Sequence, residues 1–157
     1  IELFSITYYR QEATMNSLSD ILTTSWLFHQ LYSRKIGKAA SCHDISKTEA
    51  DILLFLQNNP DFDTAKDIVN IRGIAKSYVS KSIDILANKN FLITSPDSKD
   101  RRVTHLQLTK EAEAALIDLK EAQEEVFTLI TRNISEERKN EVRLAFRQIA
   151  ANIKEEL

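Results

Sequence analysis

Apolar residues recur at helical spacing along most of the chain. From about residue 17 to residue 37 they fall three or four positions apart, which predicts one long helix ending near Gly37. The residues that follow, GKAASCHDI, are expected to form a loop. Two more apolar stripes run through residues 110–157. They predict two long helices there, the first capped by Thr109 and the second starting at Ser135.

Capping chemistry predicts two shorter helices between these ends. Ser46 and Glu49 stand three positions apart, as Thr64 and Asp67 do, and apolar residues follow each pair. At this spacing each side chain can satisfy the free backbone N–H of the other residue, which is the arrangement called a capping box. The second of these helices is expected to end near Gly73.

A further helix and a β-hairpin complete the middle of the chain. The apolar stripe of this helix consists of Val79, Ile83 and Leu86. Asn90 is suited to end the helix in the left-handed backbone conformation. Residues 91–94 then predict a short strand, residues 95–98 have turn chemistry, and apolar and polar positions alternate from 102 to 108.

Composition agrees with a mostly α fold that includes one small hairpin (α+β). The 157 residues suit a single domain, 1–157, and contain only two Gly and two Pro, too few for a fold made of many turns. The single cysteine, Cys42, excludes an internal disulfide and fits a reducing, cytoplasmic setting. No apolar run approaches the ~20 residues of a membrane span, and no signal-peptide pattern opens the chain. Residues 1–14 carry no firm interpretation.

The formal net charge of −2 hides an uneven distribution. Residues 66–109 carry eight basic and four acidic side chains, a local charge of +4, whereas residues 1–65 and 110–157 each carry −3. A positive middle between negative flanks indicates that one part of the molecule meets an anion, although chance clustering on a solvated face would give the same count.

The order of elements suggests a helix-turn-helix followed by a wing. Two short helices joined near a glycine form the first motif, in which the second helix enters the major groove of DNA. The exposed face of that second helix offers donors for bases and phosphates: Lys76, Ser77, Tyr78, Ser80 and Lys81. By itself this pattern also fits an ordinary amphipathic helix with a solvated face.

The hairpin favours the DNA-binding interpretation. Its tip places Asp100 beside Arg101 and Arg102, and an arginine side chain fits the narrow, negative minor groove. Asp100 cannot attract a phosphate, but it can hold a neighbouring arginine through a charge-assisted hydrogen bond. The alternative is a surface ion pair worth roughly 0–1 kcal/mol.

Residues 46–109 resemble the winged helix-turn-helix of the MarR family of multiple-antibiotic-resistance regulators. The resemblance is carried by KSYVSKSIDILANKNFL leading into DRRVTHLQLT, and the family's wing pattern Asp-x-Arg falls on Asp100 and Arg102. The resemblance implies that Arg102 enters the minor groove, that Asp100 holds it, and that Arg101 contacts phosphate, with Lys99 beside them. Two residues depart from the family pattern: Ala75 stands where Ser or Thr is usual, and Asn90 where Gly is frequent.

The helices at both ends are expected to form a dimer. Segments 17–37 and 110–157 present more apolar surface than a ~65-residue DNA-binding module can cover, and exposed stripes of this kind mark interfaces. A two-fold homodimer would place two recognition helices ~34 Å apart on a pseudo-palindrome. The alternative is a helical hairpin packed within one subunit.

The resemblance also implies a small-molecule effector between these helices and the winged domain. Four side chains could line such a pocket or belong to the core or the interface: Trp26, Phe28, His29 and Tyr32.

Catalytic and metal sites are not expected. The adjacent residues Cys42, His43 and Asp44 cannot readily close one tetrahedral metal site, and neither His29 nor His105 adds supporting spacing. A redox switch needs a reactive and accessible thiolate, and the sequence gives no indication of either for the single cysteine, Cys42. No phosphate-binding loop, catalytic triad or zinc signature occurs, so we expect no cofactor and no enzyme.

The sequence therefore predicts a cytoplasmic, homodimeric, sequence-specific regulator of transcription that binds double-stranded DNA. We expect a repressor that is relieved by a small ligand. The rival hypothesis is a winged-helix module that binds another protein without binding DNA, and the basic segment 66–109 argues against it.

Overall fold

The computed structural model describes residues 18–156 and has the predicted order of helices and hairpin. The elements are α2 (Leu18–Ser41), α3 (Lys47–Asn58), α4 (Ala65–Arg72), α5 (Lys76–Asn88), β1 (Leu92–Pro96), β2 (Thr104–Leu108), a 3₁₀ turn (Lys110–Ala112), α6 (Glu113–Ile130) and α7 (Glu136–Glu155). Expectations for residues 1–17 and 157 lie outside the described part of the chain.

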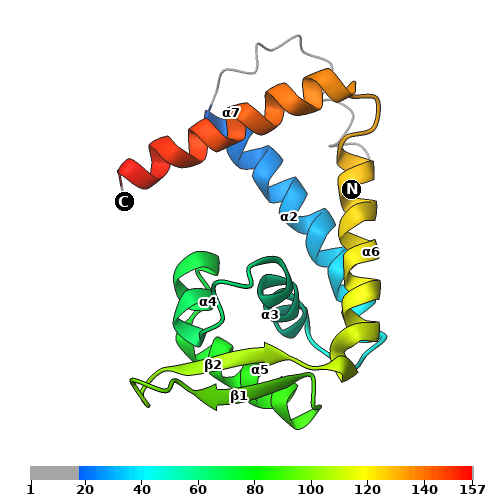
Figure 1. The fold of residues 1–157 in the computed structure, drawn as a ribbon. Helices are drawn as coiled ribbons and strands as arrows, with labels where there is room; N and C mark the ends of the chain where they lie inside the picture. Colours follow the sequence, from blue (N-terminus) through cyan, green and yellow to red (C-terminus); the bar gives the residue numbers. More distant parts are fainter. Residues whose placement is uncertain (1–17, 157) are drawn as a thin grey trace.

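Two groups of elements are visible in the fold. The helices α3, α4 and α5 and the hairpin form the lower group in Figure 1, and the long helices α2 and α6 lie side by side above it. The helix α3 joins the two groups because it packs against α2 and α6 on one side and against α5 and β2 on the other. This arrangement is a winged helix-turn-helix with helices from both ends of the chain attached to it.

The core is centred on α3. Ile52, Leu53, Leu54 and Phe55 are four consecutive residues with no exposed surface, so this helix is buried almost all round. A helix whose middle is apolar on every side belongs in the interior of a fold. Each such side chain contributes roughly 1.5–3 kcal/mol of favourable transfer free energy. The burial of α3 therefore fixes the elements around it.

The two predicted capping boxes are confirmed. Ser46 Oγ accepts from the Glu49 amide while the Glu49 carboxylate accepts from the Ser46 amide, and Thr64 and Asp67 are paired in the same way. Gly73 ends α4 in the left-handed conformation with φ 66°.

The expected features of α5 and its end are also present. Ala75 stands at the N-cap of α5 without a side-chain hydrogen bond, as its missing hydroxyl implies. Asn90 follows the helix with φ 58°, the left-handed conformation expected of it.

The end expected for the first helix is wrong. The helix α2 runs through Gly37 to Ser41, so the loop after it is shorter than predicted. The reason is tertiary packing, since Ile36 and Ala40 are fully buried and continue the apolar stripe through the last turn. The left-handed residue of the connection is Asp44, with φ 52°.

The expected cap at Thr109 is also wrong. Its side chain makes no capping hydrogen bond, and its hydroxyl instead donates to the carbonyl oxygen of Asn90. A 3₁₀ turn, Lys110–Ala112, therefore separates the hairpin from α6.

The ends of the strands also differ from the predicted ones, because β1 extends to Pro96 and β2 begins at Thr104 rather than at residue 102. By contrast, Ser135 caps α7 as expected.

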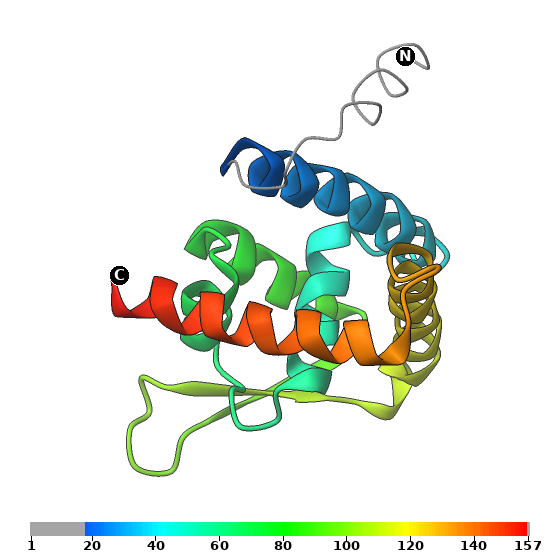
Figure 2. The same ribbon diagram turned by 90° about the horizontal axis from the view of Figure 1, so that it is seen from above.

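The last helix, α7, has no buried residue within the single chain. Figure 2 shows that α2 and α7 extend from α6 without packing against each other. Large apolar side chains of α7 are nevertheless present and exposed: Val142, Leu144, Phe146, Ile149 and Ile153. The alternative of a helical hairpin packed within one subunit therefore does not describe α7.

We expect alanine to have opposite effects at the two glycines. Gly73→Ala forces a side chain into a left-handed position and is expected to lower the free energy of unfolding by about 1–2 kcal/mol. Gly37→Ala lies inside α2, where the added Cβ meets nothing within 4 Å, and is expected to raise it by about 0.5–1 kcal/mol. Urea unfolding of both variants measures the difference. Equal effects of the two variants would contradict the assignment of α2 and of the α4 end.

Candidate nucleic-acid interface

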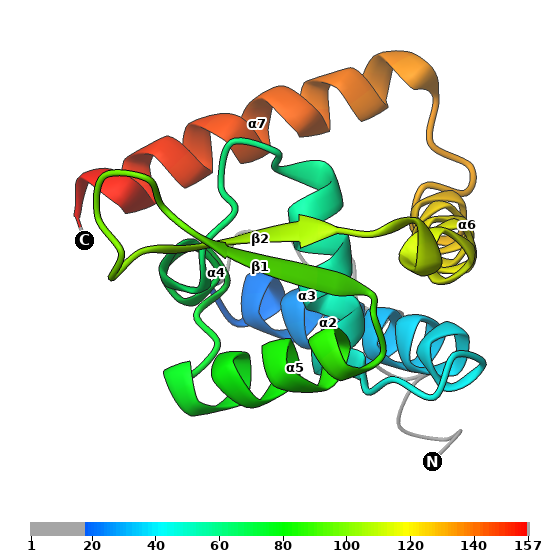
Figure 3. The ribbon, with the colours of Figure 1, turned by 60° about the horizontal axis from the view of Figure 1, so that its bottom comes forward.

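The outer face of α5 is polar and open. Its stripe of Val79, Ile83 and Leu86 is buried against the domain, which turns the other residues of its N-terminal half outward. All five predicted contact residues on this helix are exposed: Lys76, Ser77, Tyr78, Ser80 and Lys81. Figure 3 shows the start of α5 on the same side of the molecule as the tip of the hairpin. The two candidate DNA-binding elements therefore face the same region.

The tip of the wing is held by the side chain of Asp97. The strands are antiparallel and pair from Leu92↔Leu108 to Pro96↔Thr104, which leaves residues 97–103 as the connecting loop. Asp97 Oδ1 accepts hydrogen bonds from the backbone N–H groups of Lys99 and Asp100, each at 2.8 Å. These two donors, with a smaller contribution from His105, lower the pKa of Asp97 to about 2. The loop is thus ordered by a carboxylate rather than by an apolar core.

Arg102 and Asp100 form a two-point ion pair at the end of this loop. Arg102 Nε lies 3.0 Å from Asp100 Oδ1, and Nη2 lies 3.1 Å from Oδ2. The Arg102 backbone N–H also donates to Oδ1, at 3.0 Å, and these bonds lower the pKa of Asp100. The side chain of Arg102 is 91% exposed. The guanidinium is therefore oriented by its partner and still open to a ligand.

A hollow of about 670 Å³ lies between α4, α5 and the wing. It is lined by Lys76 and Ser80 of α5, by Arg102, and by Lys66 of α4, among others. The fold thus brings three of the predicted contact residues to one concave surface. The remaining predicted residues are not part of its lining, and lie exposed or, for Asp100, partly exposed around it: Ser77, Tyr78, Lys81, Lys99, Asp100 and Arg101.

Two residues near this surface were not among the predicted contacts. Lys66, on the first turn of α4, belongs to the basic stretch 66–109, and this charge was the only sequence signal that could have marked it. His105 connects the wing to the start of α4 through Asp63, and no local pattern indicates a contact between residues so far apart in the sequence.

The side chains discounted as metal or redox candidates have structural partners. His43 Nε2 lies 2.7 Å from Asp118 Oδ2 of α6, and Cys42 Sγ lies 3.5 Å from the carbonyl oxygen of Lys38. Within residues 18–156, no three His, Cys, Asp or Glu side chains are grouped in a way that could hold a metal ion. The structure thus gives no new reason to assign a metal or redox role here.

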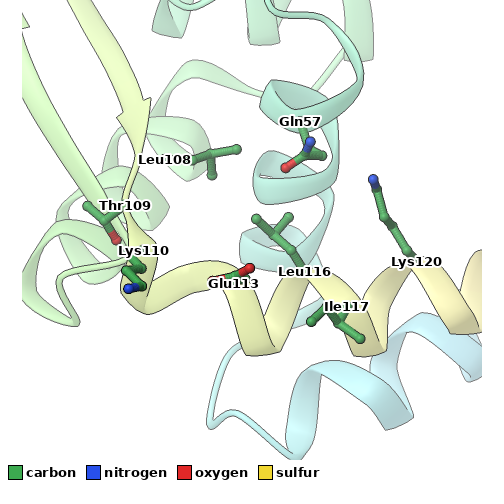
Figure 4. Close-up of a pocket in the computed structure, with 8 residues that line it drawn as sticks. All are labelled: Gln57, Leu108, Thr109, Lys110, Glu113, Leu116, Ile117 and Lys120. Carbon is green, nitrogen blue, oxygen red and sulfur yellow. The ribbon is translucent and has the colours of Figure 1, made fainter.

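A smaller hollow of about 330 Å³ lies where the wing meets α6 (Figure 4). It is bounded by Gln57 of α3, by Leu108 and Thr109, and by the exposed side of α6. The aromatic side chains proposed for an effector pocket are not part of its lining. Trp26 and Phe28 are exposed on α2, and Tyr32 is half-buried, with its hydroxyl 3.4 Å from Asp51 Oδ1.

We expect Asp97 to remain ionised at unusually low pH. Because its folded pKa is about 2, below the ordinary value of 3.8, the hydrogen bonds that it accepts stabilise the loop above pH 3.8 and are lost as pH falls towards 2. Carboxyl-carbon NMR at pH 3.8 is expected to show Asp97 still in its ionised form. Half protonation of Asp97 at that pH would contradict its role in the loop.

Comparison with known proteins agrees with this architecture. Residues 43–103, the winged helix, match the model of the MarR family. No curated protein sequence matches the chain significantly.

Solved structures match over nearly the whole chain. A MarR transcriptional regulator from Methanosarcina mazei Go1 superposes with a TM-score of 0.77 at 17% identity, over 88% of this chain and 99% of that one. The S. aureus MepR–DNA complex gives a TM-score of 0.69 at 16% identity, over 90% and 99%. Bordetella bronchiseptica BpsR, described with regulation of its DNA binding by 6-hydroxynicotinic acid, gives 0.65 at 15% identity, over 89% and 97%. At these identities the structures show a shared fold, and the winged helix carries the family match. The winged-helix segment, residues 43–103, is therefore similar to that of the MarR family, and the described chain shares the fold of solved MarR regulators.

Proposed function

We propose that this protein is a transcription regulator that binds double-stranded DNA in a sequence-specific way. The observation that carries the proposal is the exposed Arg102, held at two points by Asp100 beside the polar face of α5. The alternative of a winged helix that binds only proteins leaves this oriented cation without a role.

The chemistry of the two elements suits the two grooves of DNA. The start of α5 enters the major groove, where lysine and serine donate to base acceptors and phosphates. Arg102 enters the neighbouring minor groove, whose narrow width strengthens its negative potential. We propose the following contact set: Lys76, Ser77, Tyr78, Ser80, Lys81, Lys99, Arg101 and Arg102, with Asp100 positioning Arg102.

Similarity to a protein that was solved bound to DNA supports the same proposal. MepR was solved with DNA, and its chain superposes over 90% of this one. The local charge of +4 over residues 66–109 coincides with α4, α5 and the wing, which are the elements that would face DNA.

We further propose that the protein acts as a homodimer. Apolar side chains of α2, α6 and α7 are exposed in the single chain, and a second copy is the partner that would cover them. They include Leu18, Ile21, Leu22, Trp26 and Leu27 of α2, Phe127 and Ile130 of α6, and Leu144 and Phe146 of α7. A two-fold axis through these helices would present two winged helices to a pseudo-palindromic site.

Regulation by a small molecule is part of the proposal. We assign the protein as a repressor that leaves its DNA site when an effector binds. The hollow at the junction of α3, β2 and α6 lies between the winged helix and the terminal helices, where a ligand could change their relative position. The regulation of BpsR by 6-hydroxynicotinic acid supports this part of the proposal by analogy.

We propose that the protein acts in the cytoplasm, where it meets the chromosome, and that it has no catalytic activity. Within the described part of the chain, no helix combines the length and the apolar character that crossing a bilayer requires.

Two substitutions at the wing are expected to weaken DNA binding. Arg102→Ala removes the guanidinium and is expected to cost ~1–3 kcal/mol of binding free energy. Asp100→Asn removes a negative charge near DNA, which alone would strengthen binding, but it also removes the support of Arg102. We expect the loss of Arg102 orientation to outweigh the removal of the negative charge, so that Asp100→Asn weakens binding about three- to tenfold. Fluorescence anisotropy at fixed salt measures both, on a duplex selected from random DNA.

Lys38→Ala is the matched control for this experiment. Lys38 is an exposed cation in the last turn of α2. The end of α2 lies on the opposite side of the molecule from the wing tip (Figure 3). We expect its removal to leave affinity unchanged, while the log–log salt dependence keeps a slope of about −0.9 per phosphate contacted. Stronger binding by Asp100→Asn, with no loss in Arg102→Ala, would refute the wing mechanism.

The dimer is expected to depend on α7. Sedimentation equilibrium should give twice the 18.0 kDa mass of the chain. Phe146→Asp places a charge on the exposed apolar face of α7 and is expected to raise the dimer dissociation constant at least about tenfold. Ile71→Asp, at a comparably exposed position on α4, is expected to leave the mass unchanged. A monomeric wild type would contradict the proposed assembly.

A further inference from the structure

A histidine joins the wing to the first helix of the helix-turn-helix. His105, on β2, has its Nδ1 2.8 Å from Asp63 Oδ1 and its Nε2 3.2 Å from Asp97 Oδ2. Asp63 lies just before α4, and Asp97 begins the wing loop. Two backbone contacts reinforce this junction, since the Leu106 N–H donates to the Asp63 carbonyl oxygen at 2.7 Å and Thr64 pairs with His105. His105 therefore stands at the point where the hairpin is attached to the helices.

The two contacts of His105 favour a charged ring. Carboxylates accept hydrogen bonds and cannot donate them, so both ring nitrogens of His105 have to donate. Only the imidazolium carries two N–H groups. A neutral ring would donate to one carboxylate and turn a lone pair towards the other, which is a repulsive contact. The geometry thus favours a protonated histidine between two acids.

Asp97 connects this histidine to the arginine at the wing tip. One oxygen of Asp97 accepts from His105, and the other accepts from the backbone N–H groups of Lys99 and Asp100. The carboxylate of Asp100 in turn holds Arg102. Hydrogen bonds through His105, Asp97 and Asp100 therefore connect Asp63 to the guanidinium of Arg102.

The charged groups around His105 favour its protonated form. Asp63 from the segment before α4 and Asp97 from the wing face the ring directly, and Asp100 lies behind Asp97. The first turn of α4, which packs near β2, adds Lys66 and Asp67, and the Asp67 carboxylate is occupied by Thr64. The hydrogen bond to Asp63, followed by that to Asp97, raises the pKa of His105 above the ordinary 6.5.

We propose that His105 is a positioning residue whose protonated ring locks the wing onto the helix-turn-helix, and that its deprotonation releases the wing and weakens DNA binding. The second half of this statement rests on the proposed function. For a group whose pKa is raised in the fold, the stabilisation is complete below pH 6.5 and is lost as pH rises through the raised value. DNA affinity is therefore highest in mildly acidic solution and declines towards alkaline pH.

The experiment measures the wing with and without DNA. In the free protein, ¹H–¹⁵N NMR follows the amides of residues 97–103 from about pH 6 to about pH 8.5, the interval in which a histidine with a raised pKa titrates. Anisotropy on a selected duplex follows affinity over the same interval. His105→Gln removes the titrating group, and Asp63→Asn gives a neutral ring an amide that can donate to it. His43→Gln is the matched control, since His43 pairs with Asp118 far from the wing.

For the wild type and for His43→Gln, we expect the wing amides to shift with the titration of His105 and the affinity to fall about three- to tenfold by alkaline pH. His105→Gln is expected to bind weakly at every pH in this interval, without the pH dependence. Asp63→Asn is expected to retain affinity at alkaline pH, which a merely structural contact would not do.

Two results would overturn the proposal: wing amides that do not respond to His105 in the free protein, or a His105→Gln variant that keeps the wild-type pH dependence. If the wing amides respond as expected while no duplex binds at any pH, the lock is upheld and the proposed function fails. The two failures are thus distinguishable.

Discussion

The burial of α3 is the constraint on which the rest of the structure depends. The side chains from Ile52 to Phe55 are fully buried, and α3 packs against α2 and α6 as well as against α5 and β2. Interiors of this kind are close-packed and deform little, so the elements around α3 have defined relative positions. The polar face of α5 and the base of the wing are therefore presented together.

The tip of the wing is ordered by hydrogen bonds rather than by apolar packing. It extends beyond α4 and α5 (Figure 3) and has no apolar core of its own, so its conformation depends on carboxylates that accept hydrogen bonds from backbone and side-chain donors. Asp97 orders the loop and Asp100 orients Arg102. Both groups act through charge, which makes the tip sensitive to protonation and to salt in a way that the core is not. An exposed arginine can thus be well oriented without being buried.

Much of this structure follows from local sequence chemistry. The capping boxes at Ser46 and Thr64 and the left-handed residues Gly73 and Asn90 depend on neighbours within one helical turn, and these predictions are confirmed. The contact between Asp100 and Arg102 is equally local, since the residues are two positions apart. That this pair binds DNA stays a prediction.

The predictions are wrong or incomplete where packing between distant residues outweighs local conformational preference. Gly37 was expected to end α2, but the burial of Ile36 and Ala40 extends the helix to Ser41. Thr109 bonds to Asn90, across the hairpin, rather than capping the next helix. The contact of His105 with Asp63 joins residues 42 positions apart, and no periodicity or motif marks such a pair. These features depend on contacts between distant parts of the chain, which local sequence patterns do not indicate.

The most direct test of the central claim asks whether Arg102 occupies the minor groove. Replacing adenine by 2,6-diaminopurine at A·T pairs flanking the α5 contacts adds an amino group to the minor groove and leaves the major-groove edge unchanged. We expect the wild type to lose about tenfold in affinity for such a duplex and Arg102→Ala to lose almost nothing further, because the blocked contact is already absent. Equal losses for the two proteins would contradict the placement of Arg102 in that groove.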